Sequence, residues 1–132
     1  MSDMQTTTHE LSIIGEYFLD AIMLGTKKYE GRIYSEKCRA MNVGDRLVLY
    51  EKEAGWGIIC LITSLHPFSS FKNMLETLGV LSFVPHMESL SHTISHDALL
   101  QKAILAYKSF PGSERVDSLG CVAIGVRFLS KI

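Results

Sequence analysis

The stretch Gly25-Thr26-Lys27-Lys28-Tyr29-Glu30-Gly31-Arg32 holds the densest group of functional side chains in the chain. Around it, residues 26–46 contain six of the thirteen basic residues and only three acidic ones. A glutamate between two cations stays ionised and orients a neighbouring arginine, whose planar fork can bind a phosphate or the edge of a base. The stretch therefore predicts a polar binding site, with a solvated strand face carrying ordinary ion pairs as the alternative.

The spacing of these residues indicates how they are presented. Successive side chains of an extended chain point to opposite faces, so Lys28, Glu30 and Arg32 share one face if residues 28–34 form a strand. Lys27 lies where the preceding helix meets this strand, and its long stem can reach over the helix end. The spacing therefore predicts a polar face of Lys28, Glu30 and Arg32, with Lys27 at its start.

The segments on either side of this stretch alternate between strand and helix patterns. Apolar residues at helical spacing precede Gly25, which is placed to end a helix. Two later segments repeat the apolar spacing of an amphipathic helix, and Ser95 is placed to cap the second one. Pro67 is expected to end a strand because it cannot donate to the sheet. The pattern predicts strands at 11–14, 28–34, 46–52, 58–65 and 116–129, and helices at 15–25, 71–78 and 97–110.

These elements predict the fold class. Five strands with two or three short helices, and no regular alternation of strand and helix, indicate a small α+β barrel with the helices packed around it. We expect residues 1–9 to form a flexible leader and residues 10–132 a single domain. The length of 132 residues and the hydrophobic content of 47% are sufficient for one buried core.

Composition narrows the function classes. The net charge is −1, which argues against non-specific binding of long nucleic acid but leaves room for a local site. Cys38, Cys60 and Cys121 are too few and too widely spaced for a disulfide framework, so we expect buried thiols. No apolar run is long enough to span a bilayer, and residues 1–10 do not have the apolar stretch of a signal peptide. We expect a cytoplasmic or nuclear protein that makes no membrane contact.

The spacing Gly25-x-Lys27-x-x-Glu30-x-Arg32 resembles the GxKxxExR signature of the ASCH domain family, whose fold is similar to the PUA RNA-binding barrel. Gly44-Asp45, the helix at 68–75, Tyr107 and the closing run 120–126 also resemble the family's pattern, in the same order along the chain. The resemblance covers residues 10–129. It implies a PUA-like barrel with a cleft that binds RNA or a nucleotide through Lys27, Glu30 and Arg32. Tyr107 lies on the apolar stripe of its helix, which favours a core position, and its hydroxyl reaching the cleft as a ligand-binding group is the alternative.

The resemblance also implies an alternative function, in which the domain is a hydrolase. Some small bacterial members hydrolyse N4-acetylcytidine with a lysine, a threonine nucleophile three residues later and a distal glutamate. This chain keeps Lys27 but has Glu30 in the place of the threonine, and a carboxylate does not replace a hydroxyl as acyl acceptor. Lys27 and Glu30 would then act as an acid–base pair on water, with Glu88 or Asp97 in the region of the distal acid.

Two further possibilities complete the analysis. ASCH-like domains also occur in transcription coactivators, so a protein partner is a second alternative. His92 and His96 are four residues apart, which would place two metal ligands on one helical face, with His86 or Asp97 as a third. Because no helix pattern surrounds them, we expect surface histidines, no metal and no cofactor. Residues 113–115 are expected to form a solvated turn, with contacts to a ligand at the rim of the cleft as the alternative.

Overall fold

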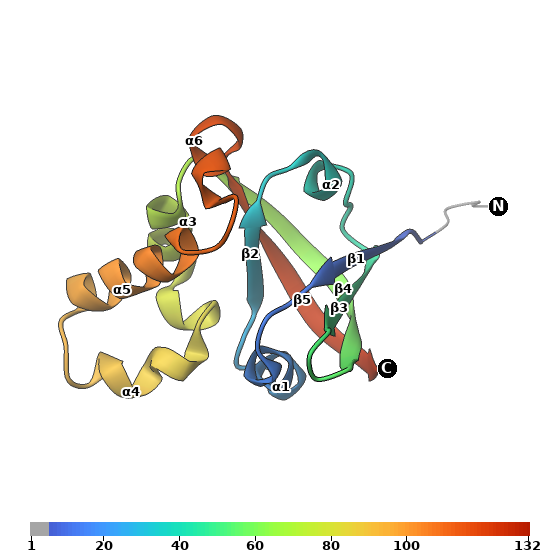
Figure 1. Ribbon diagram of the computed structural model, residues 1–132, viewed down its shortest axis with the longest axis horizontal. Coiled ribbons are helices and arrows are strands. Elements are labelled where there is room, and N and C mark those ends of the chain that lie inside the picture. The colour runs from blue at the N-terminus through green and yellow to red at the C-terminus, as the bar shows by residue number, and fades with distance from the viewer. Residues whose placement is uncertain (1–5) are drawn as a thin grey trace.

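The computed structural model describes residues 6–132, which form a five-stranded sheet with helices around it (Figure 1). The sheet is mixed, because β1 and β3 run parallel while all other neighbours run antiparallel. It curls into a half-barrel, so the predicted α+β class and its five strands are confirmed. In sheet order the strands are β1 (Thr8–Ser12), β3 (Arg46–Glu51), β4 (Trp56–Phe68), β5 (Cys121–Lys131) and β2 (Tyr29–Ile33).

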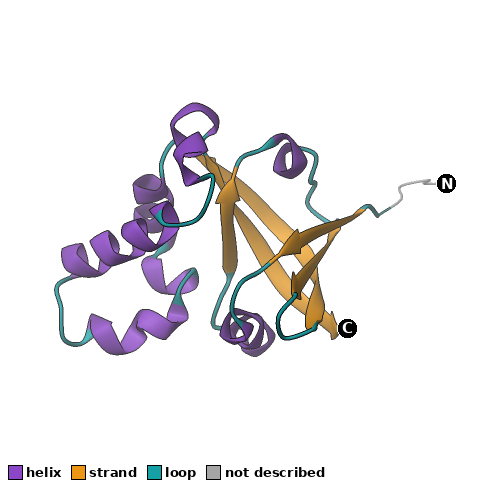
Figure 2. Cartoon of the chain, in the orientation of Figure 1, coloured by secondary structure: helices purple, strands orange, loops and turns teal. Residues whose placement is uncertain are grey.

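Helices are more numerous within residues 6–132 than the two or three that the sequence predicts (Figure 2). The three predicted ones are present as α1 (Glu16–Leu24), α3 (Phe71–Leu78) and α5 (His96–Lys108). Three further helices of a single turn are α2 (Glu36–Arg39), α4 (Glu88–Ser91) and α6 (Val116–Leu119). The 3-10 turns are η1 (Val80–Ser82), η2 (Pro85–Met87) and η3 (Ser113–Arg115).

The first and the last strand of the chain both begin at residues other than those predicted. Strand β1 begins at Thr8, because Thr8 and His9 pair with Arg46 and Leu47 of β3. Thr8 and His9 therefore belong to the sheet and not to the expected leader, whose residues 1–5 lie outside the described residues. The predicted strand at 116–129 was wrong at its start, since residues 116–119 form α6 and Gly120 separates them from β5.

Strand β4 continues past Pro67, where the sequence predicts its end. Pairing with β3 extends only from Trp56 to Leu61, whereas pairing with β5 extends to Phe68. At Pro67 the strand thus has a neighbouring strand on one side only. A residue without an N–H group is tolerated at such an edge position.

The ladder between β2 and β5 separates two hydrophobic cores. Cys121 and Ala123 of β5 face the core formed with α3 and α5, and Val122 and Ile124 face the core inside the half-barrel. The alternation follows from the period of two along a strand. Strand β2 therefore lies at the border between the two cores, and its apolar side chains, Tyr29 and Ile33, pack against the core formed with α3 and α5.

The fold also bears on the cysteines and on membrane-spanning segments. Cys38, Cys60 and Cys121 are free and buried, as predicted. Among residues 6–132, no helix is both long enough and apolar enough to cross a membrane.

Candidate functional site

The turn between α1 and β2 fixes the position of Lys27. Gly25 ends α1 in the left-handed conformation with φ of 84°, which glycine adopts without steric cost. The backbone N–H groups of Thr26 and Lys27 then both donate to the carbonyl of Ala21, at 3.0 and 3.1 Å. This turn directs the Lys27 side chain inward, and only 3% of the residue is exposed.

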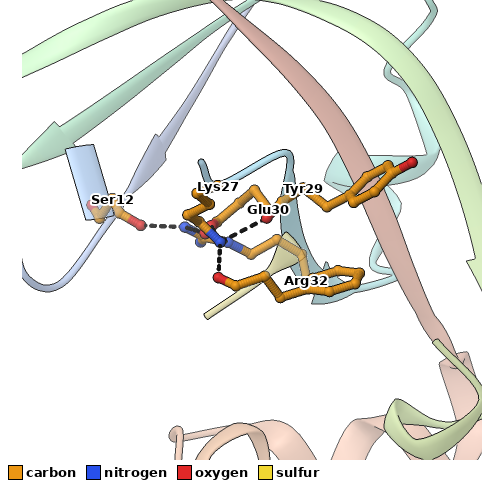
Figure 3. A network of polar contacts seen from close by, with 6 residues as sticks. Ser12, Lys27, Tyr29, Glu30 and Arg32 are labelled. Atoms are coloured by element: carbon orange, nitrogen blue, oxygen red, sulfur yellow. Dashed lines mark hydrogen bonds and ion pairs between the residues drawn. The ribbon is translucent and has the colours of Figure 1, made fainter. Parts of the chain in front are cut away.

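The Lys27 ammonium is fully occupied by acceptors (Figure 3). Its Nζ lies 2.6 Å from the carbonyl oxygen of Tyr29, 2.8 Å from that of Phe83 and 3.2 Å from Oε1 of Glu30. Burial lowers the pKa of Lys27, the Glu30 carboxylate opposes that shift, and the Arg32 charge adds a smaller lowering. Because three acceptors require three N–H donors, the geometry holds Lys27 in its charged form.

Glu30 is the counter-ion for two cations. The residue is 7% exposed, and its Oε2 accepts a hydrogen bond from Arg32 Nε at 2.8 Å and forms an ion pair with Arg32 Nη2 at 2.6 Å. Burial alone would raise the pKa of Glu30, but Arg32 and Lys27 outweigh it and lower the pKa. Glu30 is therefore ionised at neutral pH, and both of its oxygens are engaged.

Arg32 joins the two outer strands of the sheet. Besides contacting Glu30, its Nη2 donates to the backbone carbonyl of Ser12 at 2.6 Å, at the end of β1 (Figure 3). The other terminal nitrogen, Nη1, makes no hydrogen bond to any of residues 6–132. With a quarter of its side chain exposed, Arg32 is the most accessible of the three charged residues.

These three side chains lie in a cleft of about 610 Å³. The end of β1 and the start of α1 form one side, and the C-terminal part of α5 with the loop after it forms the other, so β2 crosses the floor. Polar groups are concentrated on the floor and on the rim at Ser109, Ser113 and Arg115.

Aromatic rings line both walls of the cleft. On the α1 side, the Tyr17 and Phe18 ring centroids lie 4.9 and 5.6 Å from that of His86, which belongs to η2. On the α5 side, the Tyr107 ring stacks on Phe71 at 5.3 Å and contacts Phe110 edge-on at 6.1 Å. Such a slot between rings, with a few polar groups at its base, is suited to a flat organic ligand.

Tyr107 is a structural residue at the junction between the α5 wall and the floor. It is 8% exposed, and its hydroxyl occupies the space that a side chain on Gly31 would need, because a Cβ there would lie 2.8 Å from Tyr107 Oη. Burial raises the pKa of Tyr107, and the charge of Glu30 raises it further. Its hydroxyl is therefore protonated at all ordinary pH values.

The structure does not bring every candidate residue into the cleft. Glu88, in α4, and Asp97, in the first turn of α5, are exposed and do not line it. His92 follows α4 and His96 begins α5, so the idea of two ligands on one helical face was wrong. Among residues 6–132, no group of three or more His, Cys, Asp or Glu residues could hold a metal ion.

Several residues of the site were not singled out from the sequence. The carbonyls of Ser12 and Phe83 bind the two cations, and neither could be found from local spacing because they are 20 and 56 residues away along the chain. Lys28, expected on the face of Glu30 and Arg32, is exposed and makes no ion pair within residues 6–132. The buried partner of Glu30 is Lys27 instead.

Comparison with known proteins finds solved structures with a similar architecture. No family model matches the chain, and no curated protein matches it. Among solved structures, the hypothetical protein PH0355 superposes with a TM-score of 0.76 at 27% identity, covering 93% of this chain and 100% of that one. Protein PF0455 from Pyrococcus furiosus superposes with a TM-score of 0.67 at 27% identity, covering 95% and 98%.

A named fold family is also among the similar structures. The ASCH protein from Zymomonas mobilis superposes with a TM-score of 0.54 at 15% identity, covering 89% of this chain and 65% of that one. At this identity the likeness concerns the fold alone. It confirms the fold that the resemblance of the sequence implied.

Proposed function

This chain has the ASCH-domain fold, and on that premise we propose that its cleft binds the base of a nucleotide or of unpaired RNA. The observation that carries the proposal is the combination of facing aromatic walls with a buried, charged floor at Lys27, Glu30 and Arg32. A base stacks on aromatic rings, and a nucleotide offers acceptors to a guanidinium on its base edge and on its phosphate. Within the floor, Arg32 Nη1 is the group with N–H donors available to a ligand.

The contacts of Lys27 favour a binding function over a catalytic one. A general acid or base must exchange a proton with the substrate, but all three N–H groups of Lys27 are already directed at Tyr29, Phe83 and Glu30. Lys27 therefore serves to neutralise and position Glu30, which in turn orients Arg32. The hydrolase alternative would require this group to rearrange on binding.

The test is a titration of labelled protein with cytidine, N4-acetylcytidine, cytidine monophosphate and a short single-stranded RNA, followed by NMR. We expect saturable shifts of the amides at residues 27–32. Phe110→Ala should weaken binding about tenfold, because stacking on an aromatic ring contributes roughly 1–3 kcal/mol per base. Phe110 is 45% exposed, so its removal should leave the fold intact.

Arg32→Ala should weaken binding at least tenfold, as expected for the loss of a charged hydrogen-bond donor worth about 1.5–3 kcal/mol. Lys52→Ala is the control, because Lys52 is exposed in the turn between β3 and β4 and does not line the cleft. Equal small effects of Arg32→Ala and Lys52→Ala would contradict the proposal. If no ligand shifts the amides of residues 27–32, the charged group is a structural ion network, and a protein partner becomes the leading idea.

The same samples test for turnover. Release of acetate from N4-acetylcytidine, or cleavage of the RNA, that disappears in a folded Lys27→Ala variant would replace binding by hydrolysis as the function. We expect no product.

A further inference from the structure

The charged residues lining the cleft are predominantly basic. Among residues 6–132, they comprise three cations, Lys27, Arg32 and Arg115, and one carboxylate, Glu30, which together carry a net charge of +2. His86, also in the lining, has its pKa lowered by burial and by Lys27, so it is neutral at pH 7. Because the whole chain carries −1 and the cleft +2, the rest of the molecule carries −3. The charged lining of the cleft is thus net positive, and the rest of the chain is net negative.

Arg115 is a cation without a counter-ion in the described chain. Its Nε donates to the carbonyl of Gly112 at 3.1 Å, and it forms no ion pair within residues 6–132. Gly112 has φ of 83°, and a Cβ there would lie 3.0 Å from Arg115 Nη2, so the guanidinium folds back against the turn before η3. This contact holds Arg115 at the rim and leaves its terminal nitrogens available.

The other polar groups of the rim do not compete as donors. The hydroxyl of Ser109 donates to the carbonyl of Ala106, and that of Ser113 donates to the carbonyl of Lys108, each at 2.6 Å. The donors offered to a ligand by the charged lining are consequently Arg32 Nη1 on the floor and the terminal nitrogens of Arg115 on the rim. Guanidinium groups bind phosphate with paired hydrogen bonds, more specifically than an ammonium does.

We infer that Arg32 and Arg115 form a phosphate subsite, so that the ligand of the cleft is a nucleotide with a terminal phosphate. This inference rests on the proposed function and goes further by naming the ligand class. A terminal phosphate carries about −1.5 to −2 charges at pH 7, which matches the cleft charge of +2. A long RNA would extend its internal phosphates beyond the cleft onto the rest of the molecule, whose net formal charge is negative, whereas a mononucleotide or a phosphorylated chain end would not.

The test compares each nucleoside with its monophosphate by isothermal titration calorimetry, using cytidine, adenosine and their 5′- and 3′-monophosphates. We expect at least one monophosphate to bind ten or more times tighter than its nucleoside. Arg115→Gln should reduce the affinity for that monophosphate at least fivefold and leave the affinity for the nucleoside within twofold. Arg115→Lys keeps the charge but loses the fork of the guanidinium. Its affinity for the monophosphate should lie between that of the wild type and that of Arg115→Gln.

Lys108→Gln is the matched control, because Lys108 is a nearby exposed cation that does not line the cleft. It should change neither affinity by more than twofold. Arg115 is exposed and its side chain makes one hydrogen bond within its own turn, so an unchanged thermal midpoint should verify that the variant is folded.

The outcomes separate the inference from the proposed function. Equal affinities of nucleoside and monophosphate would overturn the phosphate subsite and leave base binding standing. If neither compound binds, the proposed function fails and the inference fails with it. Equal binding of a tetranucleotide with and without a 5′- or 3′-phosphate, at an affinity above that of the nucleoside, would assign Arg32 and Arg115 to an internal phosphodiester and overturn the terminal one.

Discussion

At the scale of single residues, the Lys27–Glu30–Arg32 group shows how a charged site can be buried at the border of two cores. Taking such charges out of water is costly, and their mutual attraction offsets this only when every donor and acceptor is paired. Here Lys27 uses its three donors, and Glu30 uses both oxygens. Among residues 6–132, no buried side-chain nitrogen or oxygen is without a partner. The group therefore adds specificity of position rather than much net stability.

The lowered pKa of Glu30 leads to a pH-dependent prediction. Glu30→Gln should reduce the free energy of unfolding by about 3 kcal/mol at pH 7, because it leaves a buried cation with a neutral partner. A carboxylate whose folded pKa lies below its usual 4.5 contributes stability that is complete above pH 4.5 and is lost as the pH falls through the folded value. The difference between wild type and variant should shrink accordingly in urea denaturation at pH 7, 5 and 3.

Glu76→Gln serves as the control for this series. Glu76 is exposed on α3 and forms no ion pair within residues 6–132, so its substitution should change stability by less than about 0.5 kcal/mol at every pH. A Glu30→Gln effect that is the same at pH 3 and pH 7 would contradict the assignment of Glu30 as an ionised partner.

At the scale of elements, the sequence predicted those segments whose boundaries are set locally. Helix α3 runs over the predicted 71–78, and Gly25 ends α1 in the expected left-handed conformation. Segments whose conformation depends on distant partners were not predicted. Residues 116–119 were expected to begin the last strand but form a helical turn, and Gly120, with φ of 73°, turns the chain before β5 begins.

The same distinction applies to the candidate site. Lys27, Glu30 and Arg32 lie within six residues of one another, so their grouping could be predicted from spacing. The carbonyls that complete their contacts come from β1 and from the end of η1, and only the tertiary fold brings them close. The aromatic walls likewise combine α1 with η2 and α3 with α5.

Helix α5, which lines part of the cleft, is capped at its N-terminus by Ser95. Ser95 Oγ accepts a hydrogen bond from the backbone N–H of Ala98 at 3.1 Å. Ser95→Ala should lower the free energy of unfolding by about 1 kcal/mol, and Ser95→Gly by only a few tenths, because glycine is a tolerated N-cap. Urea denaturation measures both values.

Ser118→Ala in α6 is the comparison, since Ser118 is exposed and its hydroxyl makes only a 3.4 Å contact with the carbonyl of Arg115. We expect an effect below about 0.5 kcal/mol. A loss at Ser95→Gly as large as that at Ser95→Ala would show that the side chain of Ser95 acts in some way other than as a cap.

At the scale of the whole molecule, two cores share the β2–β5 ladder and the cleft opens where they meet. The three cysteines report on both cores, because Cys121 faces the helices while Cys38 and Cys60 lie in the half-barrel. Burial raises the pKa of all three, to about 12 for Cys60 and about 11 for Cys121. Thiolate, the reactive form, is thus scarce in the folded protein.

Thiol labelling should therefore follow unfolding. At pH 8 in the folded state, a maleimide should modify Cys60 and Cys121 at least a hundredfold more slowly than in urea, and mass spectrometry should find all three cysteines modified once the protein is unfolded. Cys38, which lines the cleft from the single-turn helix α2, should react first. Modification of Cys60 or Cys121 at the rate of an unfolded chain would contradict the two-core arrangement.

The pairing of Glu30 with two cations restricts how this sequence can diverge. Replacing Lys27 alone leaves Glu30 with one counter-ion, and replacing Glu30 alone leaves two cations side by side in a confined space. Each single change is disfavoured, whereas a joint change of all three positions to apolar residues is not. We therefore expect natural variation to keep or exchange positions 27, 30 and 32 as a set, while the surface residues around them vary independently.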